Sequence, residues 1–192
     1  MTKVAIVFHS GFGHTGVLAE AVGRGAASVP GVDARLVPAT EVDGHWDYLD
    51  EADAIIMGSP TYMGSVSAGL KAFMEATVDR YFEQRWRDKL AAGFTNSASQ
   101  SGDKINTLVD IAMFAAQHGM IWVNLGLVAG NDSSTGSAGD LNRLGGWMGA
   151  MGQSNADQGP GEAPPESDRL TAEHLGRRVA EAAVRWGKMT GD

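Results

Sequence analysis

Short apolar runs alternate along the chain with segments whose apolar residues recur at helical spacing. The apolar runs predict five strands, at Lys3–Phe8, Val32–Pro38, Ala52–Gly58, Leu90–Thr95 and Met120–Leu127. The helical spacing predicts four helices, at Val17–Ala27, Leu70–Thr77, Lys104–Gln117 and Arg169–Lys188. The third run is apolar on both faces of the strand, which is typical of parallel sheets covered by helices on both sides.

Strands that alternate with helices predict an α/β fold with a doubly wound, five-stranded parallel sheet and helices on both faces. The chain has 192 residues, which favours a single domain over two. Ligands of such sheets bind beyond the carboxyl ends of the strands. Binding residues are therefore expected in the loops that follow the first, third, fourth and fifth strands.

The segment 129–168 is longer than an ordinary connection in a compact domain. It is rich in glycine, but it also contains Leu141, Leu144, Trp147 and Met148, bulky apolar residues that a mere linker does not need. We therefore expect an ordered lid or an inter-subunit arm. Trp147 has two open interpretations, a role at a ligand site or subunit contact and simple packing of the arm.

The charge of the chain disfavours nucleic acid as a partner. The formal net charge is −8, and acidic residues are scattered along the sequence, whereas nucleic-acid binding requires a concentrated basic face. One local basic cluster, which we expect to be a solvated surface, consists of Arg80, Arg85, Arg87 and Lys89.

The chain has no cysteine, which excludes disulfides, thiolate nucleophiles and cysteine-ligated metal centres. We expect no metal site. The first apolar run is too short for a signal-peptide core, and no segment approaches the roughly 18 apolar residues of a membrane span. The expected location is therefore cytoplasmic.

The first strand is followed by VFHSGFGHTG, in which Gly11, Gly13 and Gly16 have the G-x-G-x-x-G spacing of a dinucleotide fingerprint. A dinucleotide loop turns from an apolar strand straight into glycine, but here Ser10 precedes the glycines and Thr15 lies inside the loop. Backbone amides, these two hydroxyls and the helix dipole can together surround a terminal phosphate monoester.

Other interpretations of this loop remain open. Glu41 lies near the end of the second strand and suits the ribose of a dinucleotide. The glycines also fit a simple tight turn from strand to helix. A P-loop is excluded, because its G-x-x-x-x-G-K-[ST] motif is absent from the sequence.

Two later loops favour a flat heterocycle attached to the phosphate. Residues 58–65, GSPTYMGS, offer an aromatic ring and a thioether beside polar backbone. Residues 95–102, TNSASQSG, offer small donors and acceptors without charge. Taken singly, each loop is also compatible with an ordinary turn or helix cap.

With these motifs, the sequence resembles the flavodoxin-like, WrbA-type NAD(P)H:quinone oxidoreductases and, more loosely, the NADPH-dependent FMN reductases. The resemblance covers nearly the whole chain, from KVAIVFHSGFGHTGVLAEAVGRGA through AIIMGSPTYMGSVSAGLKAFMEAT to AAQHGMIWVNLG and the last helix. It implies strand order 2-1-3-4-5, FMN as cofactor, NADPH or NADH as electron donor and a quinone as acceptor. It further implies two-electron transfer by a ping-pong mechanism and a homo-oligomer, either a dimer or a homotetramer, with sites near subunit contacts.

The resemblance also implies roles for individual residues. The residues expected at the FMN phosphate are Ser10, Gly11, Phe12, Gly13, His14 and Thr15. Those expected beside the flavin ring are Pro60, Thr61, Tyr62, Met63 and Gly64. Those expected at its pyrimidine edge and ribityl chain are Asn96, Ser97, Ala98, Ser99, Gln100 and Ser101.

Phe12, Tyr81 and Trp147 are expected near the nicotinamide or the substrate. The family's usual His-His pair corresponds here to Gln117 and His118, so either residue is a candidate to face the flavin and His118 is a candidate cofactor ligand. Phe12 stands where the family has a tyrosine, and Tyr62 stands where an arginine is common. No acid–base pair is expected, because the flavin itself performs hydride transfer.

Three other functions stay open at this point. The first is a flavodoxin-type carrier of single electrons, without turnover of NAD(P)H. The second is a flavin reductase that supplies reduced FMN to a partner oxygenase. The third is an NAD-binding protein of the Rossmann type, without flavin.

Overall fold

The computed structural model describes residues 1–190 and centres on a parallel sheet in the order β2-β1-β3-β5-β6. These strands are β1 (Thr2–Phe8), β2 (Val32–Pro38), β3 (Ala54–Tyr62), β5 (Leu90–Ser97) and β6 (Ile121–Trp122). Counted along the five predicted strands, the order is the expected 2-1-3-4-5. Two short strands were not predicted: β4 (Ser65–Val66) is antiparallel to β3, and β7 (Ala150–Gln153) is parallel to β5.

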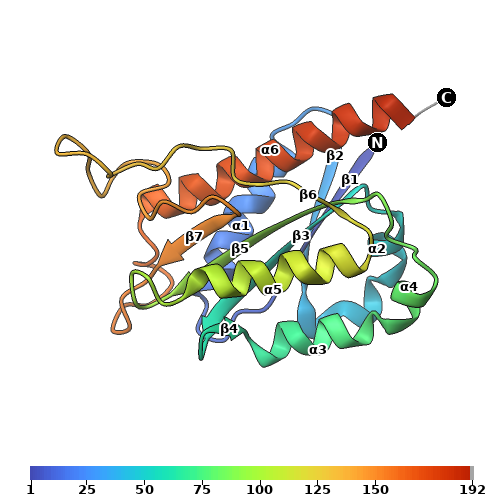
Figure 1. Ribbon diagram of the computed structural model, residues 1–192, viewed down its shortest axis with the longest axis horizontal. Helices are drawn as coiled ribbons and strands as arrows, with labels where there is room; N and C mark the ends of the chain where they lie inside the picture. Colours follow the sequence, from blue (N-terminus) through green and yellow to red (C-terminus); the bar gives the residue numbers. More distant parts are fainter. Residues whose placement is uncertain (191–192) are drawn as a thin grey trace.

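Helices cover both faces of the sheet, as Figure 1 shows. They are α1 (His14–Ala27), α2 (Trp46–Glu51), α3 (Ala68–Ala76), α4 (Val78–Phe82), α5 (Lys104–Gln117) and α6 (Glu166–Thr190), with a 3₁₀ helix at Ala39–Gly44. One apolar core lies between the sheet and α1 with α6. The second lies between the sheet and α2, α3 and α5. Within residues 1–190, none of the helices combines the length and the apolar character needed to cross a membrane.

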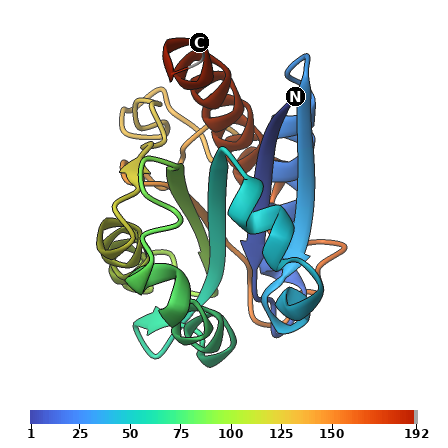
Figure 2. The same cartoon turned by 90° about the vertical axis from the view of Figure 1, so that its right-hand side faces the viewer.

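The two cores lie on opposite faces of the sheet, because successive side chains of a strand point to opposite faces. In β1, Val4 and Ile6 enter the core beneath α1 and α6, whereas Ala5 and Val7 enter the core on the other face. All four side chains are completely buried. A strand that is apolar at successive positions therefore belongs in the middle of a covered sheet, where β1 lies (Figure 2).

The predicted strand Met120–Leu127 is too long. Only Ile121 and Trp122 form β6, opposite Leu90 and Ala91 of β5. The carboxyl half of β5 pairs instead with β7, which comes from near the middle of the segment 129–168. Apolar residues after Trp122 still pack into the core without joining the sheet, so hydrophobicity alone could not locate the end of the strand.

Glycines allow β7 to enter the sheet at this point. A Cβ on Gly149 would lie 2.0 Å from the carbonyl oxygen of Gly93 in β5, so a larger residue does not fit. The indole of Trp122 donates to the carbonyl of Met148 at 3.0 Å, which ties the end of β6 to the chain entering β7.

Smaller corrections concern the ends of other elements. The strands β3 and β5 continue to Tyr62 and Ser97, so several residues predicted in loops are strand residues, and Pro60 lies opposite Asn96. The helix α1 begins at His14 rather than Val17, and α6 begins at Glu166 rather than Arg169. These shifts bring predicted binding residues onto regular elements.

The helices α1 and α6 cross at glycines, and this contact predicts a large effect of a single methyl group. A Cβ on Gly25 would lie 1.9 Å from the carbonyl oxygen of Glu173, and a Cβ on Gly176 would lie 1.9 Å from that of Val22. We expect Gly25→Ala or Gly176→Ala to lower the free energy of unfolding by about 2 kcal/mol or more, measured by urea denaturation.

Gly187→Ala is the matched control, because it lies in the same helix α6 and its added Cβ would meet nothing within 4 Å. We expect this change to be neutral or to stabilise the protein by up to about 1 kcal/mol. Equal effects of the three substitutions would contradict the described crossing.

Candidate functional site

A pocket of about 510 Å³ lies at the carboxyl edge of the sheet. Its size is within the range of cofactor pockets. Four segments line it, through Phe12, His14 and Thr15; Pro60, Thr61 and Tyr62; Asn96, Ser97 and Ala98; and Ser154, Ala156, Gln158 and Gly159. None of these residues is Asp, Glu, Lys or Arg, so the pocket offers neutral polar groups and apolar surface.

The amino end of α1 provides hydrogen-bond donors to the pocket. Gly13 precedes the helix with a φ of 91°, a backbone conformation that favours glycine. In the part of the chain that the structure describes, the amides from Phe12 to Thr15 donate to no protein acceptor. Ser10 Oγ accepts from the amide of Gly16 at 3.0 Å and holds the turn closed. Free amides at the positive end of a helix form a site for an anion.

An aromatic pair forms the apolar side of the pocket. The rings of Phe12 and Tyr62 meet edge to face, with centroids 6.2 Å apart. Gly11 permits this approach, since a Cβ there would lie 2.5 Å from the phenolic oxygen of Tyr62. Burial raises the pKa of Tyr62, so the phenol is neutral at pH 7. Met63 follows as a fully exposed residue at the rim.

Buried hydroxyls and amides fix the ends of β3 and β5. Thr61 Oγ1 lies 2.8 Å from the hydroxyl oxygens of both Thr95 and Thr107, and these three side chains are buried. The side-chain amide of Asn96 contacts Ser154 Oγ at 3.1 Å. These contacts hold the two strands and the segment after β7 in one arrangement.

The segment after β7 forms a wall of the pocket that sequence reasoning did not identify. In this segment, the carbonyl oxygen of Gln158 lies 2.9 Å from His14 Nε2. Pro160 packs against Gly13, and a Cβ added to Gly13 would lie only 2.8 Å from Pro160 Cγ. The lining residues Ser154, Ala156, Gln158 and Gly159 were not predicted as site residues. The only signal in the sequence was the unusual length and apolar content of the segment 129–168.

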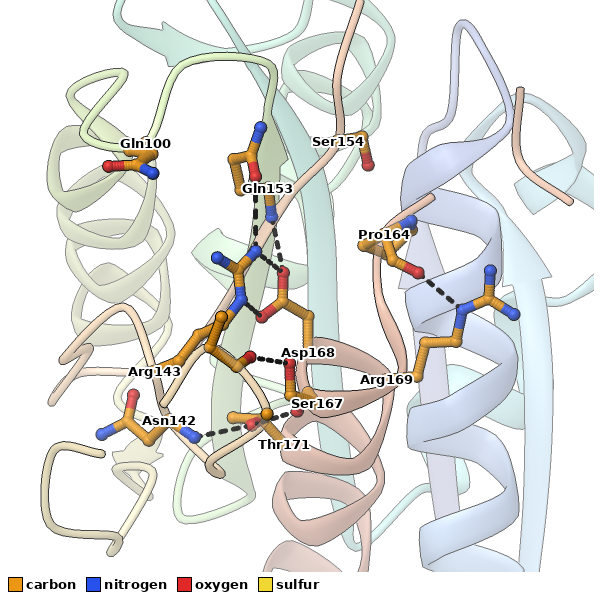
Figure 3. Close-up of polar contacts among 12 residues, drawn as sticks. Gln100, Asn142, Arg143, Gln153, Ser154, Pro164, Ser167, Asp168, Arg169 and Thr171 are labelled. Atoms are coloured by element: carbon orange, nitrogen blue, oxygen red, sulfur yellow. Dashed lines mark hydrogen bonds and ion pairs between the residues drawn. The ribbon is translucent and has the colours of Figure 1, made fainter. Parts of the chain in front are cut away.

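A buried ion pair anchors this wall, as Figure 3 shows. Both nitrogens Nε and Nη2 of Arg143 donate to the carboxylate of Asp168 at 2.8 Å, and the amide of Gln153 donates to the same carboxylate at 2.9 Å. The side chains of Arg143 and Asp168 are only 9% and 2% exposed. Gln153 Nε2 donates in turn to the carbonyl of Ala98 at 2.9 Å. The pair thus connects α6, β7 and the loop after β5.

Not every predicted site residue lines the pocket. Of the residues expected at the phosphate, Ser10, Gly11 and Gly13 shape the turn without lining the pocket, and the same holds for Met63 and Gly64 at the rim. The side chains of Ser99, Gln100 and Ser101 are exposed beyond it. Glu41 lies in the 3₁₀ helix and does not line it.

Within one chain, four further predicted residues lie elsewhere. Tyr81, Gln117 and His118 line a separate cavity of about 260 Å³ beside α4 and the end of α5. His118 in its lining packs against Trp86, which precedes β5, so this cavity lies toward the amino end of that strand and away from the pocket. His118 is buried, and its Nε2 contacts Thr77 Oγ1 at 3.0 Å. Burial lowers the pKa of His118. Trp147 is exposed outside both cavities.

The expected basic surface is mostly used for internal contacts. Arg80 and Arg85 pair with Asp50, and Lys89 donates to the backbone carbonyls of Asp50 and Ala52. These contacts join α4 and its following turn to α2.

Comparison with known proteins connects this geometry to a family. The sequence pattern of the family "NADPH-dependent FMN reductase" matches residues 36–134, slightly more than half of the chain. The chain belongs to this family. A similar protein, "Flavodoxin FldP" of Pseudomonas aeruginosa, is 43% identical over 94% of this chain and 96% of its own length. An "NAD(P)H dehydrogenase (quinone)" of Acidithiobacillus ferrooxidans is 30% identical, over 94% of this chain and 96% of its own length.

Solved structures confirm the flavodoxin-like fold and the resemblance to WrbA-type proteins. A flavodoxin, WrbA-like protein from Agrobacterium tumefaciens superposes with a TM-score of 0.76 at 37% identity, over 96% of this chain and 99% of its own. Membership of the FMN reductase family also supports FMN as the cofactor.

The buried ion pair predicts how the wall of the pocket can be released. Asp168→Asn leaves the buried guanidinium of Arg143 without a counter-ion, so we expect the free energy of unfolding to fall by about 3 kcal/mol. Amide hydrogen exchange of β7 should accelerate, because a neutral side-chain amide with one oxygen replaces the carboxylate that accepts from both Gln153 and Arg143. Glu75→Gln is the control, since it removes only the exposed pair with Lys71 and should change stability by less than about 0.5 kcal/mol. A loss for Asp168→Asn as small as in the control would contradict the anchoring role.

Proposed function

We propose that this protein is an FMN-dependent oxidoreductase that transfers two electrons from NADPH or NADH to a quinone by a ping-pong mechanism. The observation that carries the proposal is the pocket itself, in which free amides at the start of α1 adjoin an aromatic wall and a neutral polar edge. The chain's family and its relatives named as quinone dehydrogenases support the same activity.

The residues present fit FMN. The phosphate belongs at the amides of Phe12 to Thr15, where the helix dipole and several N–H donors favour a dianion although no residue that lines the pocket is Lys or Arg. The ring belongs against Pro60, Thr61 and Tyr62, and its polar edge belongs against Asn96 to Ala98. The remaining predicted ligands, Ser10, Gly11, Gly13, Met63, Gly64 and Ser99 to Ser101, are proposed to shape these three segments.

The bound flavin supplies the chemistry of hydride acceptance and electron release. The protein holds the ring between fixed walls and keeps charged side chains out of the pocket, so neutral aromatic substrates can stack at its open side. Phe12 lies at that side with 77% of its surface exposed. We propose that Phe12 contacts the nicotinamide and then the quinone, which occupy the same place in turn.

We also propose that the active form is a homo-oligomer, a dimer or a tetramer. Tyr81, Gln117, His118 and Trp147 do not reach the pocket of their own chain, so any role at a flavin requires a neighbouring copy. An exposed apolar surface adjoins the cavity of Tyr81, Gln117 and His118, and it consists of Val78, Tyr81 and Phe82, whose ring contacts that of Tyr81. In such an assembly, these residues would complete the site of another subunit.

An anaerobic titration tests the activity. FMN-loaded protein is mixed with NADPH or with NADH while flavin absorbance is followed, and benzoquinone is then added. We expect full loss of the oxidised flavin spectrum with at least one nucleotide and rapid recovery with quinone. Failure of the protein to bind FMN would refute the proposed cofactor and activity together.

A flavodoxin-type electron carrier is the second candidate, favoured by the 43% identical relative named as a flavodoxin. It predicts that FMN binds tightly but that neither nucleotide reduces it, while a one-electron chemical donor does. The same titration therefore separates the two candidates.

Sedimentation velocity tests the assembly. We expect a dimer or tetramer for the wild-type protein and a shift toward monomer for Phe82→Ser, whose side chain is 75% exposed and belongs to the apolar surface described above. Val128→Ser is the control, because Val128 is 80% exposed but lies outside that surface. A wild-type monomer at micromolar concentration would contradict the proposed oligomer.

A further inference from the structure

Lys104 is a buried cation directly behind the loop that follows β5. It is the first residue of α5, and only 1% of the residue is exposed. Its ammonium has three N–H donors, and these reach Ser97 Oγ at 2.7 Å, the carbonyl of Ser99 at 2.8 Å and that of Gln100 at 2.7 Å. Every donor is therefore directed at one short loop.

The backbone is shaped to bring this side chain to the loop. Gly102 and Asp103 both have positive φ values, 55° and 53°, so the chain reverses just before α5. A Cβ on Gly102 would lie 2.3 Å from Ser97 Oγ, and a larger residue there would occupy the position of the lysine's acceptor. Two consecutive left-handed residues are uncommon, and here they serve to place Lys104 against residues 97–100.

The positive charge of Lys104 has little electrostatic stabilisation from its surroundings. A cation at the amino end of a helix is opposed by the helix dipole. The nearby carboxylate of Asp168, on α6, already accepts both bonds from Arg143 of the preceding segment, so that pair is neutral in itself. Burial lowers the pKa of Lys104 to about 8, while Asp168 acts to raise it and Arg143 acts to lower it. Such local conflict is typical of residues that serve a function.

We propose that Lys104 is a positioning residue of the flavin site, which fixes the loop 97–100 and places a positive charge behind the polar edge of FMN. The proposal rests on the function proposed above. Ser97 connects the two, because it lines the pocket and also accepts a hydrogen bond from Lys104. Reduction adds electron density to the flavin ring, so a nearby cation stabilises the reduced cofactor more than the oxidised one.

Lys104→Met tests this inference, because methionine is close in size but has no charge and no donor. In the full chain at pH 7, we expect the Kd for FMN to rise about tenfold or more. The midpoint potential of the bound flavin should become more negative. Lys104→Arg, which keeps the charge, should restore much of the potential even if the affinity recovers only in part.

Lys89→Met is the matched control. Lys89 is half-buried and, like Lys104, donates to two backbone carbonyls, here those of Asp50 and Ala52, but it lies at the opposite end of β5. We expect this variant to lose thermal stability without any change in the Kd for FMN or in the potential. A general loss of stability is thereby separated from an effect at the pocket.

The pH dependence gives a second measurement that needs no variant to fold. Because the cation is lost as pH rises through about 8, the affinity of the wild-type protein for FMN should fall between pH 7 and pH 9. The stability of the protein without FMN should change in the opposite direction. An unfolded lysine keeps its proton to higher pH than Lys104 does, so Lys104 contributes increasing stability above pH 8. Both trends should be absent from Lys104→Met.

Unchanged Kd, potential and pH profile in Lys104→Met would overturn this inference and leave the proposed function intact. A flat wild-type affinity between pH 7 and pH 9 would also contradict it. If the wild-type protein binds no FMN at all, the proposed function itself is wrong, and the inference is refuted with it.

Discussion

The pairing of β5 with two different segments determines the rest of the site. Ile121 and Trp122 cover its amino half, and β7, from much later in the chain, covers its carboxyl half. Because β7 joins the sheet at Phe94 to Ser97, the residues that follow it are delivered to the mouth of the pocket. The buried pair of Arg143 and Asp168 holds that strand in place. Part of the long segment 129–168 thereby forms one wall of the pocket.

The electrostatics of the pocket follow from the same arrangement. A chain with a net charge of −8 presents an anion site without a cationic side chain in its lining, and it does so with the unpaired amides of α1. Dipoles that are fixed by the backbone bind a phosphate without attracting polyanions in general. Lys104 is a cation buried behind the loop at the other end of the pocket, where the ring belongs, and unlike Arg143 it has no carboxylate bonded to it within residues 1–190.

Local patterns predicted five strands, four helices and three of the four segments that line the pocket, and the family resemblance implied the sheet order. They succeeded because β1, β3 and β5 are apolar runs that end in polar residues, and because Gly13 marks the turn after β1. The fourth segment, from Ser154 to Gly159, could not be predicted, since its position depends on a strand pairing between residues more than 50 apart. Lys104 was missed for a related reason. A lysine at the start of a helix is usually exposed to solvent. The burial of Lys104 depends on the left-handed turn that precedes it.

FMN binding is expected to depend most on the amides at the start of α1, which anchor its phosphate. Calorimetric titration of the same protein with FMN and with riboflavin, which lacks only the phosphate, tests this directly. The structure predicts that riboflavin binds about 100-fold more weakly or worse, because it leaves several oriented donors without an acceptor. Equal affinities for FMN and riboflavin would show that the phosphate is held elsewhere and would contradict the account.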